Sequence, residues 1–306
     1  MTARSPRCAE FARSIGADPL GSAPHSAGFL LVEWPLPWPR DPDEVPALRR
    51  VVAAARAEGL RVQLIVPRGS GGASRVVTYR ADLEAPEDRY RRREWSGDLQ
   101  QLAGAALDGV VGPIPVADAV DEVVDVLVCG HGKRDACCGS GGTALAVAAS
   151  ASGLDDEARV RVWRTSHLGG HRFAPTALVL PTGTMWAFAD VALLERVVHR
   201  VGDPASVLDR YRGSTLLGAA GAQALERVAF AEIGWAWERW AWEVGEVEGR
   251  WHLRGWGPEG DERRWEAVVT AGAPVPVPDC GAPVEVRTRT QAAPVIAEVR
   301  SMPEAG

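Results

Sequence analysis

The sequence predicts an α/β protein built from three consecutive segments, at residues 1–115, 116–202 and 203–306. In the first two segments, short β-branched runs alternate with helical patterns, which is typical of strand–helix–strand units. In the third segment, a helical stretch precedes shorter strand-like runs, and seven of the twelve tryptophans lie between Trp235 and Trp265. We therefore expect two α/β domains followed by a tryptophan-rich α+β domain.

The first segment predicts one parallel α/β unit. The apolar run at residues 29–34 predicts a buried strand. Asp41 and Pro42 then predict a helix start, because an aspartate can cap the first amide groups and proline fits the first turn. Apolar residues recur at helical spacing until Gly59, where the helix is expected to end. The next two expected strands are residues 62–66 and 75–79.

The second segment predicts the order β-α-β followed by β-β-α. Its two helices are expected at residues 143–151 and 191–199. This order resembles the thioredoxin fold, in which a cis-proline opens the third strand, and Pro175 stands at that position. The expected strands are residues 123–128, 160–163, 175–180 and 184–188. Because the first segment opens in a similar way, a degenerate thioredoxin-like duplication remains an open alternative.

The third segment predicts a helix and then strands. Asp203 and Pro204 form a second capped helix start, and the helical pattern runs to about Trp242. We expect the tryptophans to form a core or a domain interface, because buried aromatic side chains dominate such contacts. Cys280 lies in a proline-rich loop and is interpreted as incidental. The expected strands are residues 251–256, 264–270 and 284–288.

Composition and charge exclude some classes of function. The formal net charge of the 306-residue chain is −6, which gives little electrostatic support to nucleic-acid binding. The one basic run, at residues 89–93, is interpreted as a solvated surface. The N-terminus lacks the apolar region of a signal peptide, and no apolar run is long enough to span a bilayer. We expect a cytoplasmic protein that does not bind membranes, and there clustered cysteines favour metal or redox chemistry.

Two pairs of soft ligands form the clearest chemical motif. Cys129 and Cys138 have eight residues between them, and His167 and His171 have three. Two thiols and two imidazoles suit a metal or iron–sulfur site. The wide cysteine spacing is unlike that of a zinc finger, whose cysteines have two to four residues between them. In a thioredoxin-like frame, the end of the first strand and the start of the first helix face the loop that carries the histidines.

The residues around these ligands resemble the sucrase/ferredoxin-like family. Its patterns CxHGxRDxCC and HxGGHRFAPxxLxLPxGxxW can be followed across residues 123–190. The resemblance implies a 2Fe–2S cluster bound by Cys129, Cys138, His167 and His171, and electron transfer to a redox partner protein that the sequence does not identify. It also implies proton coupling, because an iron-bound histidine keeps a second ring nitrogen that can carry a proton.

Five neighbouring residues are expected to surround the ligands rather than to bind iron. The adjacent thiol, at Cys137, is interpreted as a spare or replacement ligand, because choosing it would shorten the family spacing by one residue. Basic groups in the loop would favour the reduced, more negative cluster. The set comprises His131, Lys133, Arg134, Cys137 and Arg172.

Two alternatives remain open for the same residues. A structural zinc site needs the same four ligands. A thiol–disulfide oxidoreductase would use Cys129 with Cys137 or Cys138, although the chain lacks a Cys-x-x-Cys motif there. A glycoside hydrolase needs two converging carboxylates, and no motif places them. We therefore expect an electron carrier or redox protein rather than a hydrolase.

Overall fold

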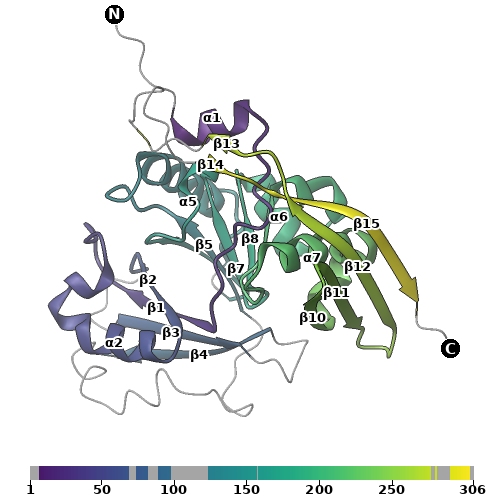
Figure 1. Cartoon of the computed structure of the whole chain (residues 1–306). Helices are drawn as coiled ribbons and strands as arrows, with labels where there is room; N and C mark the ends of the chain where they lie inside the picture. Colours follow the sequence, from purple (N-terminus) through teal and green to yellow (C-terminus); the bar gives the residue numbers. More distant parts are fainter. Residues whose placement is uncertain are drawn as a thin grey trace, which may run out of the picture.

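A nine-stranded mixed sheet forms the centre of the molecule (Figure 1). The computed structural model describes residues 7–68, 74–81, 89–97, 123–156, 158–276, 280 and 290–303. In order across the sheet, the strands are β4 (Tyr90–Gly97), β3 (Ser74–Ala81), β1 (Gly28–Glu33), β2 (Leu60–Ile65), β6 (Val160–Thr165), β5 (Val124–Cys129), β7 (Ala177–Leu180), β8 (Thr184–Trp186) and β9 (Tyr211–Ser214).

The sheet contains the same strand order twice. The orders β2-β1-β3-β4 and β6-β5-β7-β8 each begin with a parallel pair and continue with antiparallel neighbours. A helix joins each parallel pair: α2 (Arg49–Ala57) in the first half and α5 (Thr143–Ala151) in the second. The halves meet where β2 and β6 pair antiparallel, at Ile65 and Thr165. One continuous sheet therefore spans both halves.

Successive side chains of each strand enter different hydrophobic clusters, because they point to opposite faces of the sheet. Leu30 packs in one cluster with α2, and Val126 packs in another with α5 and α6 (Val191–His199). Leu31, Leu127 and Cys129 belong to a third cluster, which also contains cysteines from outside the sheet. This third cluster places Cys129 in the interior, on the face of the sheet opposite the one that packs against α5 and α6.

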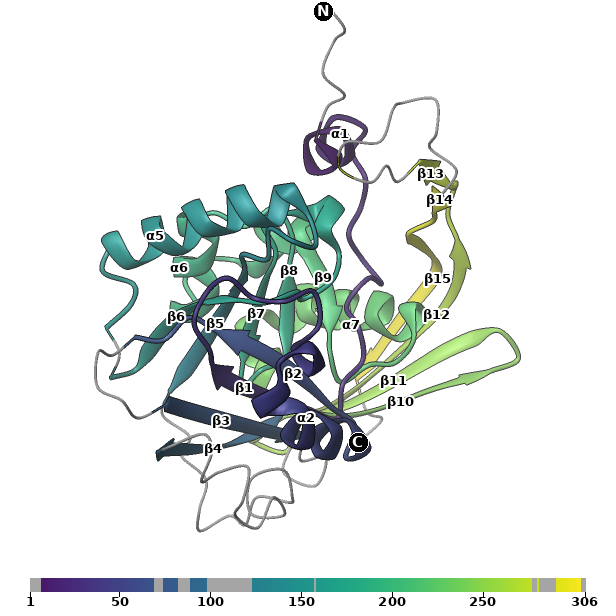
Figure 2. The ribbon, with the colours of Figure 1, turned by 90° about the vertical axis from the view of Figure 1, so that its left-hand side faces the viewer.

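A second sheet is formed by the C-terminal part of the chain. Helix α7 (Ala220–Ile233) lies between the two sheets (Figure 2). Trp237, Trp240 and Trp265 pack against one another with ring centroids 5.6–6.3 Å apart. The expected tryptophan core is confirmed. The antiparallel strands of this sheet are β10 (Ala241–Val247), β11 (Arg250–Trp256), β12 (Glu262–Ala271) and β15 (Pro294–Pro303), and β13 (Val275–Pro276) pairs with β14 (Thr290–Gln291).

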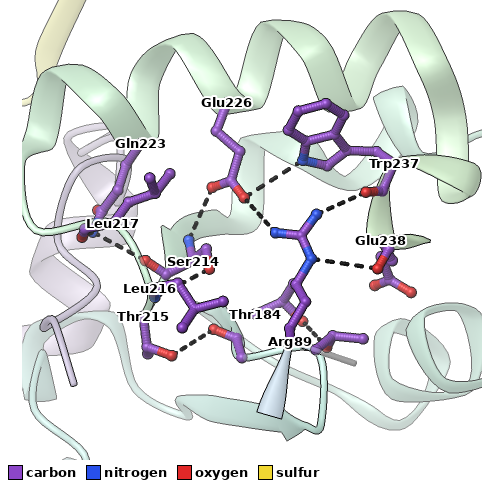
Figure 3. Close-up of polar contacts among 12 residues, drawn as sticks. Arg89, Thr184, Ser214, Thr215, Leu216, Leu217, Gln223, Glu226, Trp237 and Glu238 are labelled. Atoms are coloured by element: carbon purple, nitrogen blue, oxygen red, sulfur yellow. Dashed lines mark hydrogen bonds and ion pairs between the residues drawn. The ribbon is translucent and has the colours of Figure 1, made fainter. Parts of the chain in front are cut away.

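A buried polar network attaches α7 to the large sheet (Figure 3). The Glu226 carboxylate accepts hydrogen bonds from the Tyr211 hydroxyl at 2.9 Å and the Ser214 amide at 3.0 Å. Its other oxygen lies 3.6 Å from the Arg89 guanidinium, which also donates to the Trp237 carbonyl at 2.7 Å. Arg89 is 4% exposed and Glu226 is 1% exposed. Two opposite charges therefore satisfy each other inside the molecule.

The interpretation of residues 89–93 as a solvated surface is wrong. Most of this run belongs to β4, and Arg92 is only 2% exposed. Its Nε lies 3.0 Å from the Asp125 carboxylate and 3.1 Å from the Tyr79 hydroxyl. The charges are tolerated in the interior because carboxylates pair with them, and two of these partners, Glu226 for Arg89 and Asp125 for Arg92, are distant in the sequence.

Most expected helices are present, with two differences. Helices α5 and α6 have the expected bounds. Asp41 caps only a 3₁₀ turn, because Pro46 holds Val45 extended and α2 starts at Arg49. The helix expected from residue 203 to about 242 is interrupted by β9, which pairs with the edge of β8. The peptide bond before Pro175 is cis, as expected.

The remaining expectations concern residues 284–288 and membrane spans. The strand predicted at 284–288 lies outside the described residues. Within the described ranges, no helix combines the length and the apolar character that crossing a bilayer requires.

Candidate metal and redox centre

Cys129 and Cys138 lie together at the carboxyl end of β5. Cys129 is the last residue of that strand, and Cys138 opens a turn of π-helix, η4 (Cys138–Gly142), which leads into α5. Both thiols are fully buried. The turn passes so close to the strand that a Cβ on Gly142 would lie 1.8 Å from the Cys129 carbonyl oxygen. Glycine at this position therefore allows the two cysteines to approach.

The loop that follows β6 brings His167 to these cysteines. Three side chains hold its carbonyl groups: Gln63 donates to His167 at 3.4 Å, Arg61 to Leu168 at 3.2 Å and Arg212 to Gly169 at 3.1 Å. The loop then turns through Gly170, whose φ of 71° is in the left-handed region that favours glycine. A fixed backbone thus sets the position of the histidine ring.

The Cys129 sulfur is the centre of this group. It interacts with the Cys138 thiol and the His167 ring, and it accepts from the backbone amides of Leu168 and His131. The hydrogen bond from Cys138, assisted by these other donors, holds the pKa of Cys129 well below its usual range. The same hydrogen bond, together with burial, raises the pKa of Cys138. The site therefore favours a thiolate at Cys129.

His171 faces a neighbouring group of side chains through its Nδ1 atom. It lies in the turn η5 (His171–Phe173), with Nδ1 3.1 Å from Asp135 Oδ2 and 3.3 Å from Cys8 Sγ. Burial raises the pKa of Asp135, but the hydrogen bond and charge of His171, together with hydrogen bonds from Cys137 and Cys280, outweigh burial, and the pKa falls to about 2. The structure thus brings Cys129, Cys138 and His167 together and places Nδ1 of the fourth expected ligand against a carboxylate.

Cys137 and Cys138 belong to different groups although they are adjacent in sequence. Cys138 interacts with Cys129, whereas Cys137 Sγ lies 3.5 Å from Cys8 Sγ and 2.9 Å from Cys280 Sγ. The hydrogen bond from Cys8 lowers the pKa of Cys137 to about 6. The assignment of Cys137 as a spare or replacement ligand stays a prediction.

The other expected neighbours take varied positions. His131 is 3% exposed and packs edge-on against Trp38, and burial lowers its pKa. Arg134 turns away, donating to the Arg40 carbonyl at 2.9 Å. The two that remain are Lys133, which is exposed, and Arg172, whose guanidinium lies over the Phe173 ring.

Sequence reasoning missed Arg212, Asp135, Cys8 and Cys280. Arg212 is 1% exposed, and burial, with the charge of Arg172, lowers its pKa to about 9. It lies in β9, within a stretch whose pattern predicts helix, so nothing local marks it. The odd number of cysteines could have drawn attention to Cys8 and Cys280. Sequence spacing, however, does not show which distant segments meet.

Comparison with known proteins supports a family assignment. Curated proteins and solved structures give no match. The sucrase/ferredoxin-like family model matches residues 19–213, which is more than half of the chain and includes all four expected ligands. The chain therefore belongs to the sucrase/ferredoxin-like family.

Proposed function

We propose that this protein transfers electrons through one 2Fe–2S cluster bound by Cys129, Cys138, His167 and His171. The observation that carries the proposal is the convergence of two buried cysteines and His167 on one point from separate segments. Amide groups that donate to the Cys129 sulfur add to the fit, because such bonds stabilise bound iron–sulfur clusters. When bound, the cluster would supply one-electron redox chemistry.

The donor atoms of the two histidines also fit a bound metal cluster. His167 Nδ1 is buried and has no hydrogen-bond partner among the described residues. A buried polar atom left unpaired costs free energy, which coordination of this ring would reduce. At His171, the Asp135 carboxylate can hold a proton on Nδ1, as carboxylates do for metal-bound histidines, and Nε2 would then be the iron-binding atom.

A thioredoxin-like frame is part of the proposal. The order β6-β5-β7-β8, with β5 and β6 parallel and the other pairs antiparallel, supports it. So does α5, which joins the parallel pair. In such a frame, the strand end at Cys129 and the helix start at Cys138 meet the loop before β7. The equivalent order in β2-β1-β3-β4 supports a duplication of this frame in the first segment.

Burial divides the proposed ligands into two kinds. The two cysteines are fully buried, whereas His167 and His171 are partly exposed, and the His171 side chain is 24% exposed. The cysteines would exclude water from their side of the site. Electrons from a redox partner and protons from solvent would arrive on the histidine side.

The first test is the colour and metal content of protein purified anaerobically. We expect red-brown protein with about two irons and two sulfides per chain. Cys138→Ser should lose the iron and the colour, and Cys137→Ser should keep them, because only Cys138 interacts with Cys129. Colourless wild-type protein with zinc in this site would contradict the proposal. The reverse result for the two variants would show that Cys137 is the ligand.

Proton coupling is tested by the pH dependence of the midpoint potential. Reduction adds negative charge, so it favours proton uptake at His167 or His171, and the potential should fall as pH rises. For one proton per electron, the slope approaches about 59 mV per pH unit. Neutral ligands also predict a potential above the roughly −400 mV of plant-type ferredoxins. Protein-film voltammetry of the wild type, His167→Cys and His171→Cys should show the slope in the wild type and lose it in the variant that lacks the histidine taking up the proton. A flat profile that neither substitution changes would exclude the histidines as ligands.

A further inference from the structure

Three cysteines from distant parts of the chain meet beside the proposed cluster site. Cys8 begins helix α1 (Cys8–Ser14), Cys137 precedes η4, and Cys280 comes from the C-terminal part. Their sulfurs lie 3.5 Å apart for Cys8 and Cys137, 3.2 Å for Cys8 and Cys280, and 2.9 Å for Cys137 and Cys280. All three thiols are free. The sulfurs are too far apart for a disulfide, whose S–S distance is about 2.05 Å.

Asp135 completes this group with a carboxylate. Its Oδ1 lies 3.4 Å from Cys280 Sγ, and its oxygens lie 3.8 and 3.9 Å from Cys8 Sγ. The four donor atoms all lie within 4.8 Å of one another. Cys8, Asp135 and Cys137 are 0%, 7% and 4% exposed. Three buried donors and one partly exposed donor, Cys280, converge in the arrangement that a bound cation requires.

The spacing of the donors fits a tetrahedral ion. With zinc–sulfur bonds of about 2.3 Å, tetrahedral geometry places two sulfur ligands about 3.8 Å apart. The sulfur–sulfur separations are 2.9–3.5 Å, which is shorter than this value, and the carboxylate oxygens lie 3.4–3.9 Å from the sulfurs of Cys280 and Cys8. A central ion would need the thiols to move outward by less than about 1 Å. Thiolates select zinc over magnesium or calcium, and a fourth protein ligand is typical of a structural zinc site.

The surroundings also suit a bound ion. Asp135 Oδ1 accepts from the Cys137 amide at 2.8 Å, which fixes the orientation of the carboxylate. Oδ2 accepts from His171, so one carboxylate oxygen can face the ion while the other keeps its hydrogen bond to the histidine. Arg7 donates to Ser140 Oγ at 2.8 Å and holds the start of α1 against η4. These hydrogen bonds therefore hold the segments that carry the thiols together without a disulfide bond.

We propose that Cys8, Cys137, Cys280 and Asp135 bind one structural zinc ion, separate from the proposed 2Fe–2S site. The ion would connect residues 272 positions apart in the chain, at Cys8 and Cys280. The donors converge only in the folded chain, where the ion would hold these distant segments together. The free energy of metal binding would therefore stabilise the folded state. Through Asp135, the zinc site would also contact His171.

Metal analysis of the full chain tests this site separately from the iron site. Protein expressed with both metals and purified without chelator should contain one zinc per chain besides any iron. Cys8→Ser and Cys280→Ser should lose the zinc and keep the iron. Cys138→Ser serves as the matched control, because it should lose the iron and keep the zinc. Zinc without iron in the wild type would sink the proposed function alone, and iron without zinc would sink only the zinc site.

Cobalt gives a readout that does not depend on how the serine variants of Cys8 and Cys280 fold. Cys138→Ser protein stripped of zinc and loaded with cobalt should show the absorption of a tetrahedral cobalt–thiolate site, and zinc should displace it. The proposal is overturned if this spectrum is absent. It is also overturned if intact mass shows a disulfide among the three cysteines of metal-free native protein, or if Cys8→Ser and Cys280→Ser retain stoichiometric zinc.

Discussion

Arg212 is the residue whose charge bears most directly on the proposed electron transfer. Its guanidinium is buried and is held by the Ser22 carbonyl at 2.6 Å and the Gly169 carbonyl at 3.1 Å. Cys129 and Cys138 lie near enough for their negative charge to raise its pKa, although burial has the larger effect and lowers the pKa to about 9. Arg212 is therefore positively charged at neutral pH and would favour the reduced, more negative cluster.

Replacing Arg212 should change the midpoint potential of the proposed cluster more than it changes cluster binding. We expect Arg212→Gln to lower the midpoint potential by tens of millivolts, because removal of a nearby positive charge destabilises the reduced state. Arg212→Lys keeps the charge and should stay nearer the wild type. Arg50→Gln, on the exposed face of α2, is the matched control and should have no effect. Equal potentials in Arg212→Gln and Arg212→Lys would refute the electrostatic role.

Single-residue inference from the sequence reaches furthest where the motif is local. The cysteine and histidine spacings predict which residues could meet, and Cys129, Cys138 and His167 do meet. Cys280 was interpreted as incidental, yet its sulfur lies 2.9 Å from that of Cys137. Contacts between residues far apart in the chain depend on tertiary packing, which no local spacing encodes.

At the scale of elements, α5 and α6 were predictable because each has a complete local pattern. Helix α6, for example, starts where Asp190 accepts from the Leu193 amide at 2.8 Å. Strand β9 was missed because its assignment depends on pairing with β8, and Gly213 there has a φ of 123°. Strand β4 was misread because charged side chains suggest exposure unless their buried partners are known.

The ion pairs of β4 predict that the free energy of unfolding falls at acidic pH. Glu94 pairs with Arg92 and Arg161, each at 2.5 Å. Burial raises the pKa of Glu94, but these arginines lower it more, to below the ordinary 4.5. The folded state then binds fewer protons than the unfolded state near that pH. Its stabilisation is therefore complete above about pH 4.5 and is lost as pH falls further.

Glu94→Gln tests this dependence. At pH 7 the variant should be less stable by about 1.5–3 kcal/mol, the usual contribution of hydrogen bonds to a charged group. The deficit relative to the wild type should shrink as pH falls below 4.5, because the wild-type carboxylate becomes protonated. Urea unfolding followed by circular dichroism at several pH values measures it. A deficit that stays constant from pH 7 to pH 3 would show that the charge of Glu94 is not responsible.

At the scale of the whole molecule, three separate contacts hold distant segments together. The β2–β6 pairing joins the two halves of the large sheet. The cluster of three cysteines brings Cys8 to Cys280. The third is the Arg89–Glu226 network, which joins the start of β4 to α7 and to the turn before β10 (Figure 3). The sequence predicted the strand–helix units but could not predict how they join, because each join depends on residues from two segments.

The Arg89–Glu226 network should be the most costly of these contacts to interrupt. Glu226→Gln keeps the shape of the side chain but leaves the buried Arg89 charge without its counterion. Removing one partner of a buried ion pair typically costs about 3–5 kcal/mol, and we expect a loss of that size in urea unfolding. Near-ultraviolet circular dichroism should show loosened tryptophan packing, since Trp237 accepts from Arg89 through its carbonyl. Glu195→Gln, on the exposed face of α6, is the control and should cost less than about 0.5 kcal/mol. If both variants lose the same small amount, the network does not hold α7 against the sheet.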